Sequence, residues 1–267
     1  MTQPCIAWKG QQRMERVAFV IPTLNEAPSI GLVLESIPAA ELADDGYETA
    51  LCVIDGQSVD HALDIALAKG AQVITEQRPG KGAAIQTAFR AVDADYVIVV
   101  DGDNTYPIGV APEMVRLLQT NDVVVGSRLK GSIGPGAMTR LNVAGNILLT
   151  LLARALFSID LSDVCTGLWG YRRDAIQCLQ LEAHGFELEA DMFSECAPKK
   201  LRVAEIPIRY SPRVDRAKLA SLRDGLKIGI HLIRKWYLDK AVRRPGNRAA
   251  AGNAGVTRDL DAGEARS

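Results

Sequence analysis

The residues whose types and spacing point most directly to chemistry are two aspartates, Asp101 and Asp103, separated by one glycine. They follow residues 97–100, a run of β-branched side chains typical of a short strand buried on both faces. In open α/β sheets, ligands bind outside the carboxyl ends of the strands. Two carboxylates at such an end are hard oxygen donors, which suit a divalent cation such as Mg2+ or Mn2+ that carries phosphates. The pair therefore indicates a metal-phosphate site.

A simpler interpretation of the same residues stays open. An aspartate after a strand often caps a turn, and an Asp-x-Asp pattern alone is a short motif with many chance matches. The rest of the sequence must decide between a metal site and a turn.

Strands and helices alternate along the first half of the chain. Runs of apolar and β-branched residues predict five strands, at 17–21, 50–54, 72–75, 97–100 and 122–126. The alternation predicts an α/β fold with a mostly parallel central sheet and helices on both faces. Because the carboxyl ends of parallel strands share one edge, polar residues that follow the strands should converge. They are Asn25, Glu26, Asp55, Asp101, Asp103 and Arg128. This convergence favours the metal interpretation.

The composition is that of an ordinary globular protein. The 267 residues are 48% hydrophobic and 24% charged, which suits one large domain or two small ones. The five cysteines are scattered without a C-x-x-C pair, which argues against a disulfide framework or a zinc site and predicts reduced thiols. The first sixteen residues lack the apolar run of a secretory signal, and no window reaches about 18 uncharged apolar residues. We therefore expect a cytoplasmic protein without a spanning helix.

The net charge of −1 conceals an uneven distribution. Residues 1–198 carry 14 Lys and Arg against 25 Asp and Glu, whereas residues 199–248 carry 15 against 4. A basic stretch after an acidic body suggests an anionic partner, namely a phosphate, a nucleic acid or a membrane surface.

Several motifs occur in an order and spacing that resemble the GT-A glycosyltransferases of family 2, and within them the dolichyl- or polyprenyl-phosphate hexosyltransferases. The motifs are Ile21-Pro-Thr-Leu-Asn-Glu26, Asp55-Gly-Gln-Ser-Val-Asp60, Gly80-Lys-Gly-Ala83, Asp101-Gly-Asp103, Gly126-Ser-Arg128, Asp163-Val-Cys-Thr-Gly-Leu168, Gly185-Phe-Glu-Leu-Glu189, and Pro212-Arg213 with Lys218-Leu219. The resemblance covers residues 17–220 and implies a GT-A fold there. The sequence departs from the family at Ile54, Gln57 and Val59, which leaves the identity of the donor base open.

The resemblance implies that the chain binds a nucleotide-sugar donor. A cation held by Asp103, with Asp101 bound directly or through water, would bridge the two phosphates and stabilise charge on the leaving oxygen. Lys81 lies where a helix begins, and amide groups there attract anions, although the segment also suits a simple turn. Glu26 has an alternative role as a first-turn carboxylate that favours the helix dipole. The implied donor-binding residues are Pro22, Thr23, Asn25, Glu26, Asp55, Gln57, Lys81, Asp101 and Gly102.

On the acceptor side, the resemblance implies a polyprenyl phosphate. The second ionisation of a phosphate monoester has a pKa of about 6, so the attacking oxygen is already anionic near neutral pH and needs no strong general base. This suits a sequence whose three histidines form no evident constellation. The acceptor phosphate needs cations instead, and the candidates are Arg128, Arg213 and Lys218. Asp163 and Glu189 are candidates for orienting sugar hydroxyls, or alternatively for caps and ion pairs.

Two segments bear on a lipid acceptor. Residues 141–159 are apolar except for four polar residues spaced four apart, which on a helix form a narrow polar stripe. Residues 221–240 combine an apolar, aromatic face with basic residues, a pattern typical of a helix that lies in a membrane interface. For both segments, packing against the domain is an alternative.

These inferences predict a domain organisation: an N-terminal extension over 1–16, a GT-A domain over 17–220, a basic amphipathic helix and tail over 221–248, and a disordered tail over 249–267. The expected function is inverting, metal-dependent transfer of a hexose from a UDP-glucose-type donor or GDP-mannose to dolichyl or polyprenyl phosphate. We expect a peripheral protein on the cytosolic face of the membrane, without a nucleic-acid partner. The alternatives are a soluble acceptor, a nucleotidyltransferase, or a non-catalytic adaptor. Homo-oligomerisation stays open.

Overall fold

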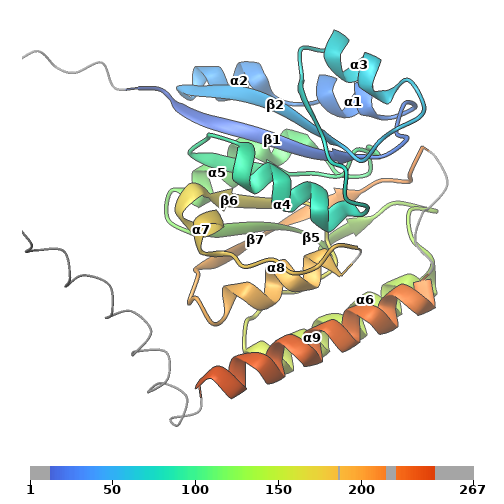
Figure 1. The fold of residues 1–267 in the computed structure, drawn as a ribbon, viewed down its shortest axis with the longest axis vertical. Helices are drawn as coiled ribbons and strands as arrows, with labels where there is room; N and C mark the ends of the chain where they lie inside the picture. The colour runs from blue at the N-terminus through green and yellow to red at the C-terminus, as the bar shows by residue number, and fades with distance from the viewer. Residues whose placement is uncertain (1–12, 186, 215–220, 244–267) are drawn as a thin grey trace, which may run out of the picture.

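The computed structural model describes residues 13–185, 187–214 and 221–243, which form a central sheet with helices on both faces (Figure 1). The strands of the described residues lie in the order β3-β2-β1-β4-β6-β5-β7. β6 runs antiparallel to β4 and β5, and the other pairs are parallel. The strands are β1 Glu15–Thr23, β2 Tyr47–Asp55, β3 Gln72–Thr75, β4 Tyr96–Val99, β5 Val123–Ile133, β6 Trp169–Arg172 and β7 Val203–Tyr210. The predicted α/β fold with a mostly parallel sheet is confirmed.

The buried strands divide their side chains between two cores. Val20 and Val97 point into one core and Phe19 and Ile98 into the other, since successive strand residues face opposite sides of a sheet. The first core is closed by α4 Lys81–Ala91, α7 Arg173–Cys178 and α8 Leu188–Cys196. The second is closed by α1 Ile30–Glu35, α2 Ala39–Asp44, α3 Ala62–Ala68 and α5 Ala111–Leu118, with the 3-10 helix η1 Ile108–Val110 before α5.

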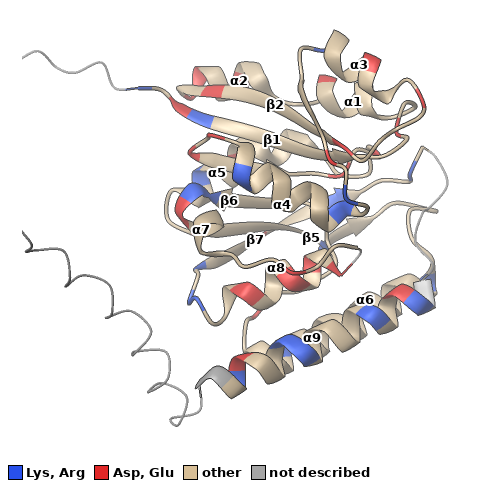
Figure 2. Ribbon diagram, viewed as in Figure 1, with Lys and Arg blue, Asp and Glu red and all other residues tan. Residues whose placement is uncertain are grey.

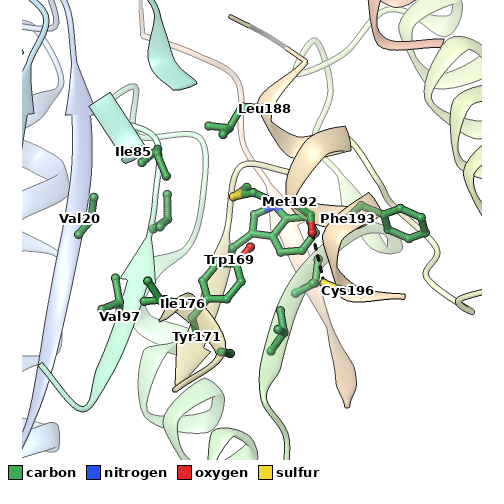
Figure 3. Close-up of a cluster of buried hydrophobic side chains, with 14 of the residues drawn as sticks. Val20, Ile85, Val97, Trp169, Tyr171, Ile176, Leu188, Met192, Phe193 and Cys196 are labelled. Carbon is green, nitrogen blue, oxygen red and sulfur yellow. Dashed lines mark hydrogen bonds between the residues drawn. The ribbon is translucent and has the colours of Figure 1, made fainter. Parts of the chain in front are cut away.

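An aromatic cluster fixes α8 against the sheet (Figure 3). Trp169 and Tyr171 of β6 stack with ring centroids 6.0 Å apart, and Phe193 of α8 meets Phe157 edge to face at 6.0 Å. Every residue of α8 is buried. Aromatic side chains contribute much of the apolar area that a core removes from water. α8 is therefore an internal helix, which makes it a rigid support for the residues that it carries.

Two long helices, α6 Arg140–Phe157 and α9 Ser221–Arg243, lie side by side outside α8 (Figure 1). Gly229 of α9 lies against Leu149 of α6, because a Cβ built on that glycine would be 3.7 Å from the leucine Cδ2 atom. Ile228 and Leu232 of α9 are buried between α9 and the domain. One face of each helix therefore packs against the domain, which was one of the two predicted alternatives.

The opposite faces of the two helices are exposed and apolar. We call these residues the outer apolar surface: Leu141, Ile147, Leu148 and Leu151 of α6, with Leu226, Ile230, Ile233 and Tyr237 of α9. The polar stripe predicted on α6 turns toward the domain at Thr150, which is buried and accepts a hydrogen bond from the backbone of Val164. α6 is also long and apolar enough, by length and composition alone, to cross a membrane. It contains Arg140 and Arg154, so it is apolar over that length without being a run of uncharged residues.

Three further differences from the sequence expectations have physical reasons. β1 continues through Pro22 to Thr23, because β4 pairs with β1 only over residues 17–20 and needs no amide donor at Pro22. β6 and β7 were not predicted, since β6 spans only four residues and Pro207 interrupts β7. The predicted N-terminal extension and terminal tail lie mostly outside the described residues, as does Lys218.

Candidate active site

Lys81 joins three elements at the carboxyl edge of the sheet. Its Nζ atom lies 2.5 Å from Oδ1 of Asp101, which follows β4, and 2.5 Å from Oε1 of Glu189 on α8. Lys81 is itself the first residue of α4. All three side chains are largely buried. Three residues predicted from separate motifs therefore meet at one ammonium group.

The electrostatics of this group are those of buried charges that compensate one another. Burial by itself lowers the pKa of Lys81, but the attraction of Asp101 and Glu189 outweighs it, so the pKa is raised. Burial raises the pKa of Asp101 to about 6, and the charges of Asp103 and Glu189 add to the rise against the attraction of Lys81. Lys81 thus stays charged, whereas Asp101 titrates close to neutral pH.

Three glycines make this arrangement possible. A Cβ on Gly167 would lie 2.3 Å from Oδ2 of Asp101, and Cβ atoms on Gly80 and Gly82 would lie 2.1 Å from the carbonyl oxygens of His184 and Ala183. A side chain at Gly80 or Gly82 would displace backbone, and one at Gly167 would displace the Asp101 carboxylate. The Gly82 amide also donates to the His184 carbonyl, at 2.9 Å, so it is not open to an anion as the sequence suggested.

Asp103 is almost fully buried and is held from two sides. Its Oδ1 atom accepts hydrogen bonds from the hydroxyl and the backbone amide of Thr105, at 2.7 and 3.1 Å. Asn104 between them has φ of 59°, which folds the loop back on the carboxylate. Its Oδ2 atom pairs with Arg213, which follows β7. The local turn that the sequence left open is therefore present, and the same aspartate also reaches a cation 110 positions away.

Arg128 and Asp163 form a buried bidentate pair beside this edge. The Nε and Nη2 atoms of Arg128 donate to Asp163 at 2.7 and 2.8 Å, and the backbone amide of Arg128 donates to it at 3.0 Å. The guanidinium lies 5.3 Å from the centre of the Tyr210 ring, which meets Tyr106 edge to face at 5.1 Å. Tyr106 in turn accepts a hydrogen bond from the Gly167 amide. Aromatic side chains therefore connect the arginine pair to the loop that carries Asp101.

Hydrogen bonds join the loop after β1 to the loop after β2, at the place where the sequence predicts that the donor base binds. Asn25 receives a hydrogen bond from Val59 at 2.8 Å and donates one to Ser58 at 2.9 Å. Asp55 accepts the amides of Gln57 and Ser58, which closes the second loop. Asn25 and Gln57 have φ of 52° and 68°, a strained conformation for non-glycine residues that often marks functional sites. Gln57 also donates to the side chain of Gln77 at 2.8 Å.

Glu26, Thr23 and Gly102 lie together between these loops and the aspartate pair. Glu26 is buried, and the Ser29 hydroxyl donates to the Gly102 carbonyl at 2.7 Å while lying 3.3 Å from a Glu26 oxygen. A Cβ on Gly102 would contact Thr23 and Glu26 at 3.5 and 3.6 Å. Pro22 lies just before, paired with Ile54 across β1 and β2. The loop after β1 thus packs directly on the loop after β4.

The donor set fits a divalent cation that also binds phosphate. Among the described residues, no group of three or more His, Cys, Asp and Glu side chains is arranged to hold a metal alone. Asp101 and Asp103 supply two carboxylates, each now balanced by a basic side chain. Mg2+ in particular is commonly bound by one or two carboxylates with substrate phosphates completing its shell. The two residues thus offer the donor types that such a metal prefers, with a diphosphate needed to complete its shell.

A groove of about 430 Å3 begins at Arg128 and follows α6. Its walls are mostly apolar, and its lining includes Leu129, Ile133, Val143, Ile147 and Leu151, with Arg154 as a second cation. Ile147 and Leu151 also belong to the outer apolar surface. The volume lies within the range of about 300–1,000 Å3 that is usual for small-molecule sites. The groove therefore connects the arginine pair to the exposed apolar face of the molecule.

Sequence reasoning missed several residues that shape this site. They are Thr105, Tyr106, Gly167, Asp191 and Tyr210. Gly167 belongs to a motif that was recognised without a role for the glycine, and Tyr106 directly follows the Asp-x-Asp loop. The only sequence signal for these five residues was that a polar residue or a glycine lies close to a matched motif.

The mostly parallel sheet with helices on both faces is a fold of the GT-A type. A similar fold occurs in the structure of glucosyl-3-phosphoglycerate synthase from Mycobacterium tuberculosis in complex with Mn2+, UDP-glucose and phosphoglyceric acid, with a TM-score of 0.63 over 87% of this chain and 82% of that chain, at 24% identity. The family profile of glycosyl transferase family 2 matches residues 18–180. The chain belongs to glycosyltransferase family 2.

Curated relatives extend over more of the chain. The dolichyl-phosphate hexose transferase of Haloferax volcanii is 34% identical over 219 residues, which are 82% of this chain and 92% of that protein. The glycosyltransferase AglJ of the same organism is 33% identical over 83% of this chain and 72% of that protein. The undecaprenyl-phosphate mannosyltransferase of Micrococcus luteus is 27% identical over 89% and 99%. The resemblance inferred from the motifs is confirmed, and the protein is a hexosyltransferase.

The close approach of Gly167 to Asp101 gives a test of the site. Gly167→Ala should lower glycosyl transfer about a hundredfold, because the new methyl group would push Asp101 from Lys81, and misplacement by about 1 Å can cost that much. Initial rates with a labelled nucleotide sugar measure the effect. Gly109→Ala is the matched control, since a Cβ there meets nothing within 4 Å. Near-normal turnover of the Gly167 variant would contradict the assigned role of this contact.

Proposed function

We propose that this protein transfers a hexose from a nucleotide sugar to a polyprenyl phosphate, with inversion at the sugar carbon and with Mg2+ or Mn2+. The observation that carries the proposal is that one residue takes part in two features. Arg128 lines the apolar groove and also contacts the Tyr210 ring, which packs on Tyr106 of the loop that carries Asp101 and Asp103. A substrate with a phosphate head and a hydrocarbon chain suits a cation beside an apolar groove. The dolichyl-phosphate and undecaprenyl-phosphate transferases to which the chain is similar support the same acceptor class.

On the donor side, Asp101 and Asp103 would hold the cation, which when bound neutralises the diphosphate and makes it a better leaving group. A cation at Asp103 competes with Arg213 for the same carboxylate. The guanidinium would then turn toward a phosphate oxygen, where a planar donor is most effective. Lys81 keeps Asp101 and Glu189 from repelling the diphosphate. The loops that contain Asn25, Glu26, Asp55 and Gln57 would receive the base and ribose.

On the acceptor side, the nucleophile brings its own negative charge. A phosphate oxygen that is ionised near neutral pH can attack the sugar carbon directly, so the chain only has to bind and orient it. Arg128 stands at the inner end of the groove and is fixed by Asp163. Lys218 was predicted as a further phosphate contact and lies outside the described residues. Glu189 is placed beside Asp101 and would contact a sugar hydroxyl.

The acceptor class is tested by where a labelled sugar goes. Purified protein with Mn2+, labelled UDP-glucose or GDP-mannose and a short polyprenyl phosphate should yield label that extracts into organic solvent. Val143→Trp, which narrows the groove, should raise the KM for a long polyprenyl phosphate about tenfold while nucleotide-sugar binding is unchanged. Leu67→Trp on α3, away from the groove, is the control.

Label that stays in the aqueous phase with every donor would refute the lipid acceptor. If label moved instead to a phosphorylated soluble acceptor such as phosphoglycerate, the family assignment would stand with a different substrate. Release of pyrophosphate from a nucleoside triphosphate would point to the nucleotidyltransferase alternative.

Metal binding should depend on pH through Asp101. A carboxylate must lose its proton to bind a metal, and this one has a pKa of about 6. Affinity is therefore full above that pKa and falls below it, with the Mn2+ dissociation constant in the presence of UDP-glucose about tenfold higher at pH 5 than at pH 7.5. Mn2+ titrations followed by electron paramagnetic resonance measure this, since the donor diphosphate itself does not titrate in that range. Equal affinities at both pH values in folded protein would contradict the metal role of Asp101.

We also propose that the outer apolar surface attaches the protein to the membrane surface that contains its acceptor. Its side chains alternate with basic residues of α9, and Lys240 stacks on the Trp236 ring at 4.2 Å near the end of the helix. Figure 2 shows basic and a few acidic residues along α9, and the only charged residues of α6 are Arg140 and Arg154. An interfacial helix pair of this kind buries its apolar face in the lipid while its cations meet anionic headgroups.

The attachment is tested by flotation with vesicles that contain anionic lipids. Leu148→Glu and Leu226→Glu, at positions 69% and 67% exposed, should each weaken vesicle binding at least about tenfold, because each removes roughly 1.5–3 kcal/mol of apolar burial and adds a repelled charge. Leu67→Glu, 58% exposed on α3, should bind as the unmodified protein does. If all three variants float equally well, this surface does not attach the protein.

A further inference from the structure

The loop of residues 179–185 between α7 and α8 lies against the first turn of α4, which carries Lys81. The carbonyl oxygens of Ala183 and His184 touch Gly82 and Gly80 so closely that a Cβ at either glycine would lie 2.1 Å away. The Gly82 amide donates to His184, and the Gln86 side chain donates to the carbonyl of Ala183 at 3.1 Å. The position of Lys81 therefore depends on this loop.

Two buried carboxylates of α8 hold the loop: Glu195 accepts the backbone amide of Gln180 at 2.7 Å, and Asp191 binds the part that touches α4. Oδ2 of Asp191, on the fully buried helix α8, accepts the backbone amides of Glu182 and Ala183 at 2.6 and 2.9 Å. These are charge-assisted hydrogen bonds in a dry environment, which are stronger than neutral ones. Asp191 lies two residues after Glu189, so one helix contacts Lys81 directly through Glu189 and indirectly through Asp191.

Helix α9 stabilises the charge of Asp191 from the other side. Nζ of Lys235 lies 3.1 Å and Nε2 of His231 lies 3.2 Å from Oδ1, the oxygen that the loop does not use. Figure 2 shows the acidic residues of α8 and the basic residues of α9 on neighbouring helices. Burial tends to raise the pKa of Asp191, but His231, the loop amides and Lys235 outweigh burial and lower the pKa to about 2. Asp191 is thus ionised throughout the physiological range.

We propose that Asp191 is a positioning residue for hexosyl transfer: it holds the 179–185 loop against α4 and thereby aims Lys81 at Asp101. The carboxylate touches no substrate and acts entirely through backbone contacts. α9, for which the sequence suggested either a membrane anchor or packing against the domain, is then also part of the support of the active site. The inference rests on the role given to Lys81 under the proposed function, but it does not depend on the acceptor.

A double-mutant cycle tests whether Asp191 acts on hexosyl transfer through Lys81. Asp191→Ala and Lys81→Met should each lower kcat/KM for the donor about tenfold or more, as is typical for residues that orient ligands. In the Lys81→Met background, Asp191→Ala should cost less than about twofold, because its partner in the chain of contacts is already absent. Equal fold losses in both backgrounds would overturn the proposal, since a purely structural role lowers activity independently of Lys81.

Two further variants keep the test decisive if Asp191→Ala folds poorly. Gly82→Ala pushes the loop away from α4 while Asp191 stays intact, so it should reproduce a loss of about tenfold, and wild-type activity in this variant would overturn the proposal. Asp122→Ala is the matched control. Asp122 also binds an arginine side chain and a backbone amide, both of Arg202, but at the opposite edge of the sheet. It should lower the melting temperature with less than about a twofold change in kcat/KM.

The cycle is measured with whichever acceptor supports turnover of the unmodified protein. If the sugar passes to a soluble acceptor, the lipid proposal fails while the cycle still decides the role of Asp191. If transfer to lipid is observed and the losses are simply multiplicative, the function stands and this inference fails.

Discussion

The interaction on which the active site depends is the pairing of a buried ammonium group with two carboxylates from different elements. Lys81 brings together the end of β4, the start of α4 and the helix α8. Breaking one side of a buried pair leaves an uncompensated charge in a dry environment, which is strongly unfavourable. All three elements must therefore pack before any of the charges is stable. The three glycines at positions 80, 82 and 167 follow from this requirement, because each removes a side chain where backbone and charged groups have to touch.

The sheet topology explains why residues so distant in sequence share one edge. β5 and β7 are parallel to each other and to β4, so Arg213, which follows β7, lies on the side where Asp101 and Asp103 leave β4. β5 continues past the predicted end at residue 126 to Ile133, so Arg128 lies within the strand, next to the register irregularity after Ser127. The antiparallel strand β6 between β4 and β5 runs the other way, so Gly167, two residues before it, enters the same edge. Acidic and basic groups thus lie side by side at this edge, where Asp101 pairs with Lys81 and Asp103 pairs with Arg213.

The fold class and most of the polar residues at the carboxyl edge of the sheet could be predicted from the sequence, because both depend on local patterns. β-branched runs mark the five predicted strands, and a polar residue after each marks the loops. What could not be predicted depends on close approach between distant segments. Nothing near Gly167 indicates that Asp101 will lie against it, and nothing near Asp191 indicates that it will accept amides from residues 182 and 183. Such contacts are fixed by tertiary packing, which a single sequence does not display.

The uneven charge of the chain also has a meaning that only the structure reveals. The excess of basic residues after position 198 suggested an external anion, but several of them pair with the acidic body: Lys199 with Glu195, Arg202 with Asp122, Arg213 with Asp103, and Lys235 with Asp191 and Glu195. Part of the polarity is therefore an internal complementarity that binds β7 and α9 to the rest of the domain. Since Asp191 and Glu195, the partners of Lys235, also accept hydrogen bonds from the loop that packs against α4, one buried cluster links α9 to the segment that carries Lys81.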